Sequence, residues 1–277
     1  MIDAAARCSF DEHGYLVARR LFDAEETAFL RDHFMRLREA GSYPGDVVGV
    51  EPDSEDPLKR YPRMIHMHRW DRVALDWLLE PRLAHSLSSL FDGLEPFAVP
   101  KMLYFKPPGR GQAVHQDQYY LRVEPGTCIA AWMALDYCDE ENGCINVVPG
   151  SHEWPVLCTI GADTSESFTD ITVPLPGDAE LVPVLMEPGD VLFFNGSLVH
   201  GSKPNRSDCF RRALIGHYIE GDARQVAHWY HPVLRMDGSE VELEAGSGGG
   251  PCGEWVDHDG RPVIELTGVA VDPRTTE

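Results

Sequence analysis

The sequence predicts a mainly β (α+β) protein in which helices precede a β sandwich or barrel. Its 277 residues are 43% hydrophobic and 25% charged, a balance typical of a water-soluble protein with a sizeable core. Helical periodicity is concentrated in the first third of the chain, whereas short apolar or alternating runs separated by turn residues follow from Phe97 onward. Because sandwiches and barrels of roughly 200 to 250 residues commonly form one domain, we expect residues 1–277 to form a single domain.

The N-terminal part of the chain is expected to contribute helices and a lid loop. Asp23 is a plausible N-cap and Glu26 completes a capping box, so the sequence predicts a helix over residues 23–41. Residues 42–63 are rich in Gly, Pro, Asp and Glu and show little periodicity, which is typical of a long surface loop that covers a site. Two shorter helices are expected around residues 71–90.

The expected parts of the domain are helices and lid loop over residues 1–95, a β core over residues 96–220 and a C-terminal extension over residues 221–277. Within this extension, residues 242–260 combine a Gly-rich stretch with charges, and we expect them to form an irregular segment or a flap laid over the barrel. The strand candidates of the core lie at residues 97–105, 128–136, 144–149, 181–186, 190–195 and 212–220.

The charge of the chain excludes two classes of partner. It carries 45 acidic and 24 basic residues, a formal charge of −21 at pH 7. A phosphate backbone or an anionic membrane surface would be repelled, so we expect neither nucleic acid nor a membrane as a partner. No apolar run approaches the roughly 20 residues needed to cross a bilayer. We expect a cytoplasmic monomer or homodimer.

Seven cysteines are spread along the chain without a C-x-x-C pair. This spacing indicates neither a disulfide framework nor a zinc ribbon. We therefore expect reduced, mostly buried thiols.

A candidate metal site includes His115 and Asp117. On a strand, residues two apart point to the same face, so the imidazole and the carboxylate are expected to converge. His200 is the candidate third ligand, because it lies just beyond residues 189–195, a turn that leads into a buried strand. Two imidazoles and one carboxylate on one face of an octahedron leave three positions open, which suits Fe(II) that binds a bidentate oxoacid and O2.

Five motifs surround these residues: K-M-L-Y-F-K-P-P-G at 101–109, H-Q-D at 115–117, A-W-M-A-L at 131–135, E-N-G-C-I-N-V-V-P-G-S-H at 141–152 and H-G-S-K-P-N-R-S-D-C-F-R-R at 200–212. In order and spacing they resemble the phytanoyl-CoA dioxygenase family of Fe(II)/2-oxoglutarate oxygenases. The resemblance implies a double-stranded β-helix core (jelly roll, cupin-like) with N-terminal helices packed on it.

The resemblance also implies how the cofactors are held. His115, Asp117 and His200 would hold the iron, and Arg211 would grip the distal carboxylate of 2-oxoglutarate. A guanidinium suits that role, because it offers two parallel donors to a carboxylate and stays charged when buried. Strand alternation sends Arg212 to the other face, where we expect a surface or salt-bridge residue.

Other pocket residues are implied by the same matches. Ser202 matches a hydroxyl that assists at the carboxylate, Trp132 a tryptophan that lines the oxoacid pocket, and Met102 a methionine on the neighbouring strand. Ordinary core packing explains Trp132 and Met102 equally well, since a pocket wall and a core call for the same residues. Tyr104 and Tyr119 are candidate substrate residues on the ground of strand alternation, with core packing as the alternative.

Several other polar residues receive structural interpretations. The basic stretch over residues 59–72 could meet an anionic group, but nearby Glu51 and Asp56 are expected to offset its charge. The histidines expected to lie in turns and to bond backbone groups are His152, His217, His228 and His231.

The resemblance implies a hydroxylase that uses Fe(II), 2-oxoglutarate and O2 and releases succinate and CO2. Asp117 fills the position that chlorine-transferring members leave for a halide, so hydroxylation is favoured. The acidity of the chain disfavours a CoA thioester, and we expect a small or medium-sized metabolite, such as a natural-product intermediate, as substrate. Desaturation, epimerisation and ring formation remain open. The alternatives from other classes are a cupin-like metal-dependent isomerase and an inactive oxygenase homologue that acts as a binding protein.

Overall fold

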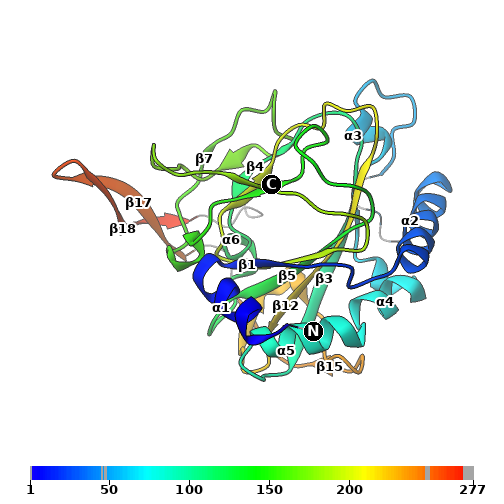
Figure 1. Ribbon diagram of the computed structural model, residues 1–277, viewed down its shortest axis with the longest axis horizontal. Coiled ribbons are helices and arrows are strands. Elements are labelled where there is room, and N and C mark those ends of the chain that lie inside the picture. Colours follow the sequence, from blue (N-terminus) through cyan, green and yellow to red (C-terminus); the bar gives the residue numbers. More distant parts are fainter. Residues whose placement is uncertain (1, 45, 47–48, 247–249, 271–277) are drawn as a thin grey trace.

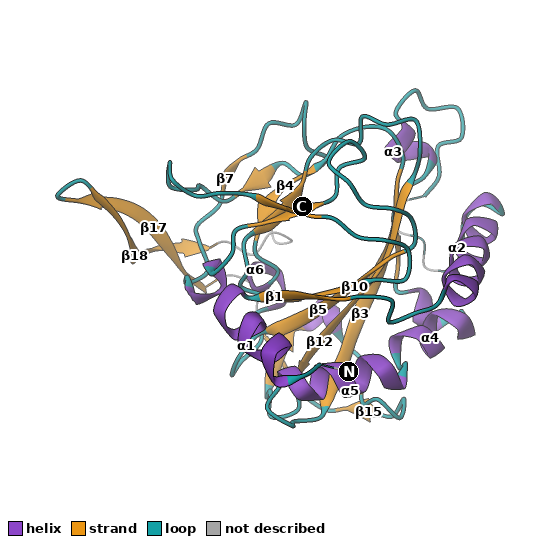
Figure 2. Ribbon diagram, viewed as in Figure 1, coloured by secondary structure: helices purple, strands orange, loops and turns teal. Residues whose placement is uncertain are grey.

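The structure, a computed structural model, describes residues 2–44, 46, 49–246 and 250–270, and two antiparallel sheets lie at its centre (Figures 1 and 2). The larger sheet has eight strands: in order β1 (Tyr15–Ala18), β10 (Val191–Asn195), β5 (Cys128–Ala134), β12 (Arg211–Glu220), β3 (Pro96–Lys106), β14 (Val233–Leu234) and β15 (Glu240–Val241), with β2 (Met64–Ile65) beside β3. The smaller sheet has β4 (Gln112–His115), β11 (His200–Ser202), β6 (Ile145–Val147) and β9 (Val182–Val184). The expected mainly β jelly-roll core is confirmed.

The central strands of the larger sheet are buried on both faces, and β5 shows how strand alternation divides these faces. Ala131 and Met133 pack with the helices, whereas Ala130 and Trp132 pack with Val147 of the smaller sheet. All seven residues of β5 are buried, which explains why this strand appears in the sequence as a continuous apolar run.

Helices from the N-terminal part cover the outer face of the larger sheet, as expected (Figure 2). Asp23 accepts a hydrogen bond from the Glu26 backbone N–H and the Glu26 side chain accepts one from the Asp23 N–H, so the predicted capping box is present. No helix among the described residues is both long and apolar enough to cross a membrane. The helices are α1 (Ala4–His13), α2 (Ala24–Glu39), α3 (Pro57–Arg60), α4 (Arg72–Leu78), α5 (Pro81–Leu90) and α6 (Gln118–Leu121).

Short elements connect the sheets and helices. The 3-10 helices are η1 (Met67–Arg69), η2 (Ser151–Glu153) and η3 (His228–Tyr230), and two small strand pairs join β7 (Ile160–Gly161) to β8 (Ile171–Thr172) and β13 (Gln225–Ala227) to β16 (Glu244–Gly246). α1 was not predicted from the sequence, although Asp3 caps it by accepting a hydrogen bond from the Ala6 N–H.

The expectation of an irregular segment over residues 242–260 was wrong for the residues that the structure describes, and residues 247–249 of its Gly-rich stretch lie outside them. Strands β17 (Gly250–His258) and β18 (Arg261–Ala270) form an antiparallel hairpin that projects from the body of the molecule (Figure 1). Its turn is Asp259-Gly260, and both residues have positive φ, 55° and 80°. An Asp-Gly pair is the commonest signal for a two-residue hairpin, so the sequence did contain the information.

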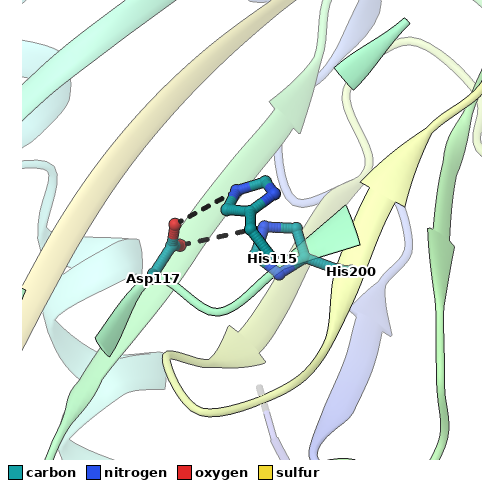
Figure 3. A group of neighbouring side chains, drawn as sticks. All are labelled: His115, Asp117 and His200. Carbon is teal, nitrogen blue, oxygen red and sulfur yellow. Dashed lines mark ion pairs between the residues drawn. The ribbon is translucent and has the colours of Figure 1, made fainter. Parts of the chain in front are cut away.

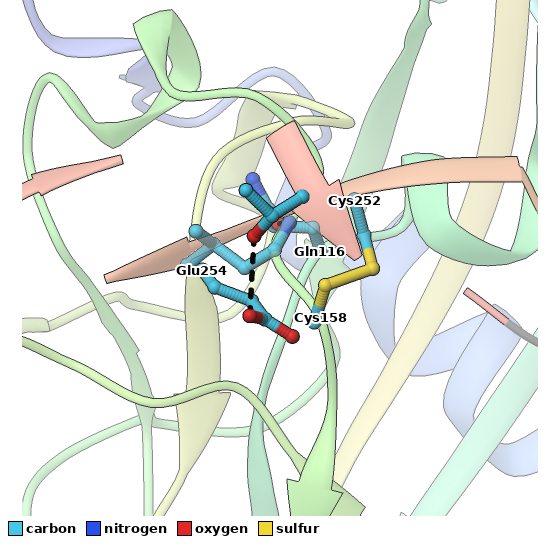
Figure 4. The surroundings of a disulfide bond; sticks show 6 residues. Gln116, Cys158, Cys252 and Glu254 are labelled. Atoms are coloured by element: carbon cyan, nitrogen blue, oxygen red, sulfur yellow. Dashed lines mark hydrogen bonds between the residues drawn. A yellow bond between two sulfur atoms is a disulfide. The ribbon is translucent and has the colours of Figure 1, made fainter. Parts of the chain in front are cut away.

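The expectation that all cysteines are reduced was also wrong. Cys158 and Cys252 form a disulfide that ties the hairpin to the segment after η2 (Figure 4). The two cysteines lie 94 residues apart in the sequence, so only the tertiary fold brings them together. The free cysteines Cys128, Cys138 and Cys144 are buried, whereas Cys8 and Cys209 are exposed.

Candidate metal centre

Three potential metal ligands meet between the two sheets (Figure 3). His115 ends β4, His200 begins β11, and the two residues are direct partners in the antiparallel register. Asp117 Oδ1 lies 3.6 Å from His115 Nε2, and Asp117 Oδ2 lies 3.9 Å from His200 Nε2. The three ligand atoms lie within 4.8 Å of one another, and all three residues are buried, so these side chains could hold one metal ion.

Asp117 does not lie on a strand, contrary to the expected alternation. Its backbone is in the right-handed helical region, at φ −63° and ψ −33°, and it is the N-cap residue of α6. The chain turns here because the fully buried Gln116 side chain bonds three distant backbone groups, of which Pro155 O is the farthest, at 3.2 Å. Its Nε2 donates to Ser197 O at 2.8 Å, and its Oε1 accepts from Leu157 N at 2.8 Å. The turn, rather than the two-residue strand period, directs the carboxylate toward His115.

Both imidazoles are held in one orientation and one tautomer. His115 Nδ1 lies 2.9 Å from Ala113 O, and His200 Nδ1 lies 3.0 Å from Leu198 O. A carbonyl oxygen only accepts hydrogen bonds, so each Nδ1 carries the proton and each Nε2 keeps its lone pair. Burial, and then the nearby His115, lower the pKa of His200 to about 4, so His200 is neutral at neutral pH. Two neutral imidazoles and a carboxylate fit a divalent first-row metal ion.

His217 belongs to this centre, and its assignment to a turn was wrong. It lies in β12, is 4% exposed, and places Nε2 3.0 Å from Asp117 Oδ2. Burial alone would raise the pKa of Asp117, but the neighbouring His217 and His200, with the hydrogen bond from His217, hold that pKa well below its ordinary value. The sequence contained a signal, because His217 follows Arg211 by an even number of residues on one strand and therefore faces the same side.

The two arginines of β12 lie on opposite faces. Arg211 is 3% exposed, and its guanidinium lies 5.0 Å from the ring centroid of Trp132. Arg212 forms an ion pair with Asp136, with Nε 2.7 Å from Oδ2. The structure thus buries one arginine against Trp132 and leaves the other in an ion pair with Asp136.

A cavity of about 520 Å³ contains the metal-ligand candidates together with Arg211, Trp132 and Ser202. The predicted lid loop supplies part of its wall through Leu58 and Tyr61. Tyr119 does not line this cavity.

Tyr119 packs against Cys252 and Ala270, and its neighbour Tyr120 lines the cavity instead. Because Tyr119 and Tyr120 lie in α6 rather than on a strand, strand alternation does not apply to them. Met102 and Tyr104 lie outside the residues whose side chains the structure describes. Of the other histidines, His152 bonds Asp11 O at 3.1 Å, in agreement with its predicted backbone contact.

Comparisons with known proteins agree with this geometry. The sequence model described as phytanoyl-CoA dioxygenase matches residues 10–213. Peroxisomal phytanoyl-CoA dioxygenase of Rattus norvegicus is 28% identical over 233 residues, which cover 79% of this chain and 68% of that protein. Phytanoyl-CoA dioxygenase 1 of Oryza sativa subsp. japonica is 27% identical over 245 residues, which cover 76% of this chain and 86% of that protein.

Solved structures show the same fold. EvdO2 from Micromonospora carbonacea var. aurantiaca matches with a TM-score of 0.63 and 26% identity, covering 79% of this chain and 91% of EvdO2. EvdO2 is also known in complex with 2-oxoglutarate. The family match spans most of the chain and includes all three metal-ligand candidates. The chain therefore belongs to the phytanoyl-CoA dioxygenase family of Fe(II)- and 2-oxoglutarate-dependent oxygenases.

Proposed function

We propose that this protein hydroxylates an unactivated C–H bond of a small or medium-sized metabolite. His115, Asp117 and His200 hold Fe(II) in this proposal, and the observation that carries it is the convergence of these three buried side chains in one cavity. With O2 and 2-oxoglutarate bound, the iron supplies the oxidising power for the C–H bond, and succinate and CO2 are released.

Arg211 binds the distal carboxylate of 2-oxoglutarate, and Ser202 lies in the same cavity to assist it. The guanidinium is buried against the face of Trp132, which restricts its direction and keeps water away from it. A carboxylate bound there forms charge-assisted hydrogen bonds, which are about twice as strong as neutral ones. The position of Trp132 supports both of its earlier interpretations, because it packs in the core and also lines the cavity.

The cavity supports a substrate of limited size. Its volume of about 520 Å³ falls within the roughly 300 to 1,000 Å³ typical of small-molecule pockets, and it must hold 2-oxoglutarate as well as the substrate.

The charges at the cavity wall do not favour the phosphates of a CoA thioester. Arg110 Nη2 is paired with Asp56 at 2.7 Å, and Lys59 Nζ lies 3.3 Å from Glu51. Glu51 thus offsets Lys59 of the basic stretch and Asp56 offsets Arg110 outside it, which lowers the positive charge available to bind phosphate.

Anaerobic titration of the Fe(II)-loaded protein with 2-oxoglutarate tests this proposal. We expect the weak visible charge-transfer band of the iron chelate to appear in the wild type. In Arg211→Ala the band should require far more 2-oxoglutarate, by about 100-fold if two charge-assisted hydrogen bonds of roughly 1.5 kcal/mol each are lost.

Arg212→Ala is the matched control, because Arg212 is the neighbouring arginine and bonds Asp136 on the other face. It should titrate as the wild type does. Equal effects of the two substitutions would show that Arg211 is not the cosubstrate arginine. Iron binding without any band in the wild type would favour an inactive homologue that acts as a binding protein.

A further inference from the structure

We propose that His217 is a positioning residue that holds Asp117 so that only one of its carboxylate oxygens binds the metal. This inference rests on the proposed role of Asp117 as a metal ligand. The contact itself is direct, because His217 Nε2 lies 3.0 Å from Asp117 Oδ2.

The two oxygens of Asp117 have different surroundings. Oδ1 lies 3.6 Å from His115 Nε2, whereas Oδ2 lies 3.9 Å from His200 Nε2 and takes the hydrogen bond of His217. A donor at Oδ2 satisfies one of its lone pairs and restricts rotation of the carboxylate about its Cβ–Cγ bond. Oδ1 keeps both of its lone pairs free of His217, and it is the oxygen that we assign to the metal.

The tautomer of His217 is determined by its other ring nitrogen. Nδ1 is buried and has no hydrogen-bond partner among the described residues. An N–H group buried without a partner is costly, whereas a carboxylate oxygen can only accept a hydrogen bond. The proton therefore lies on Nε2, where it is donated to Asp117 Oδ2.

The surroundings of His217 keep its ring in place. In the sheet it lies between β5 and β3, with Ala130 and Val99 as its register partners. All three residues are buried. The donor is thus held by the middle of the larger sheet, while the carboxylate that it holds lies in the turn before α6.

One-oxygen binding has a functional consequence. The cofactor set requires three open metal positions, two for 2-oxoglutarate and one for O2. A carboxylate that binds through both oxygens would occupy one of these positions. By engaging Oδ2, His217 keeps this position available, in the way that outer hydrogen-bond partners orient metal ligands in general.

The matched variants His217→Gln and His217→Asn test the inference. The side-chain amide of Gln can place its nitrogen near the original Nε2, whereas that of Asn is one methylene shorter and cannot reach Asp117. We expect His217→Asn to weaken Co(II) binding by about 10- to 100-fold, the usual cost of losing such a partner, and His217→Gln to stay closer to the wild type. The probe is Co(II) alone, titrated in competition with a chelator.

The visible spectrum of bound Co(II) provides a second readout that does not depend on activity. Its band shape and intensity report coordination number, so His217→Asn should change the spectrum and His217→Gln should restore it. Ile215→Val is the packing control, because Ile215 lies on the same strand, also lines the cavity, and has no hydrogen bond to Asp117. It should bind Co(II) with the wild-type affinity and spectrum.

Two results would overturn the inference. His217→Asn could bind Co(II) with unchanged affinity and spectrum, or His217→Gln could be as weak as His217→Asn, which would mean that the hydrogen bond is not what matters or that His217 is itself a ligand. Failure of the wild type to bind Co(II) would instead refute the proposed metal site. Thermal melting of the metal-free variants identifies any variant that does not fold. If His217→Asn does not fold, the Co(II) spectrum of His217→Gln decides whether the inference holds.

Discussion

The metal centre and the C-terminal hairpin are anchored to the molecule in different ways. Each metal-ligand candidate is buried and bonded to a second group: His115 to Ala113 O, His200 to Leu198 O and Asp117 to His217. The hairpin strands β17 and β18 pair mainly with each other, and Leu266 and Val269 are 65% and 77% exposed. A single disulfide joins the hairpin covalently to the body.

This difference shows which property each region controls. The polar side chains of the metal centre contribute little to the apolar core, so their removal should affect chemistry more than stability. The disulfide closes a large loop of the chain, so its removal should affect stability more than chemistry. The two regions meet at Gln116, which separates His115 from Asp117 and accepts a hydrogen bond from Leu157, next to Cys158.

Removal of a metal ligand should have the largest effect. We expect His115→Ala and Asp117→Ala to reduce the conversion of 2-oxoglutarate to succinate to background, because the iron is no longer held, while circular dichroism still reports a folded protein. Succinate release, with or without a substrate, is the measurement. Normal turnover by either variant would contradict the assignment of these residues.

Removal of the disulfide should have a smaller effect, and this effect should fall on stability rather than on turnover. We expect Cys252→Ser to lower the free energy of unfolding by about 2 to 4 kcal/mol, because the unfolded chain regains the freedom that the cross-link removed. Urea denaturation measures this loss, and wild-type protein in dithiothreitol should match the variant.

Cys209→Ser is the control for that variant, because Cys209 is an exposed free thiol. Its stability should equal that of the wild type. Turnover sharpens the comparison: activity should survive in Cys252→Ser, and a loss comparable to that of a ligand variant would show that the hairpin supports the metal centre through Gln116.

Counting the reactive thiols tests the disulfide of the hairpin without a substitution. The native protein should expose two reactive thiols, Cys8 and Cys209, and the unfolded, unreduced chain should show five. Burial raises the pKa of Cys138 to about 12, so moderate alkali should not make it react while the protein stays folded. Seven thiols in the unreduced chain would disprove the disulfide and support the predicted cytoplasmic location, where disulfides are rare.

A substitution in the helices that cover the larger sheet should have the smallest effect. It serves as a baseline for substitutions in the metal centre and the hairpin. The hydrogen bond from Arg82 is the main cause that lowers the pKa of Glu26. Its contribution to stability is therefore present above the unfolded pKa of about 4.3 and is lost as the pH falls through the lower folded pKa. Glu26→Gln should cost no more than about 1 kcal/mol at pH 7, since the pair is partly exposed, and the cost should vanish in acid.

Much of the fold could be predicted because its signals are local. The capping box of α2 involves residues three apart, and the strands of the core differ from the helices in the period of their apolar residues. The metal-ligand candidates were also predictable, because two of them are neighbours in the chain and the third begins a strand after a recognisable turn. The hairpin turn at Asp259-Gly260 was equally local and was missed.

The sequence by itself determined the mainly β fold, the candidate metal ligands and the separation of Arg211 from Arg212 onto two faces of one strand. Only the tertiary structure decided the turn that aims Asp117, the hydrogen bond of His217 and the pairing of Cys158 with Cys252. The physical reason is the separation along the chain over which each signal acts. Periodicity and capping depend on residues within one or two turns, whereas these contacts join groups that become neighbours only when the sheets and the hairpin have packed.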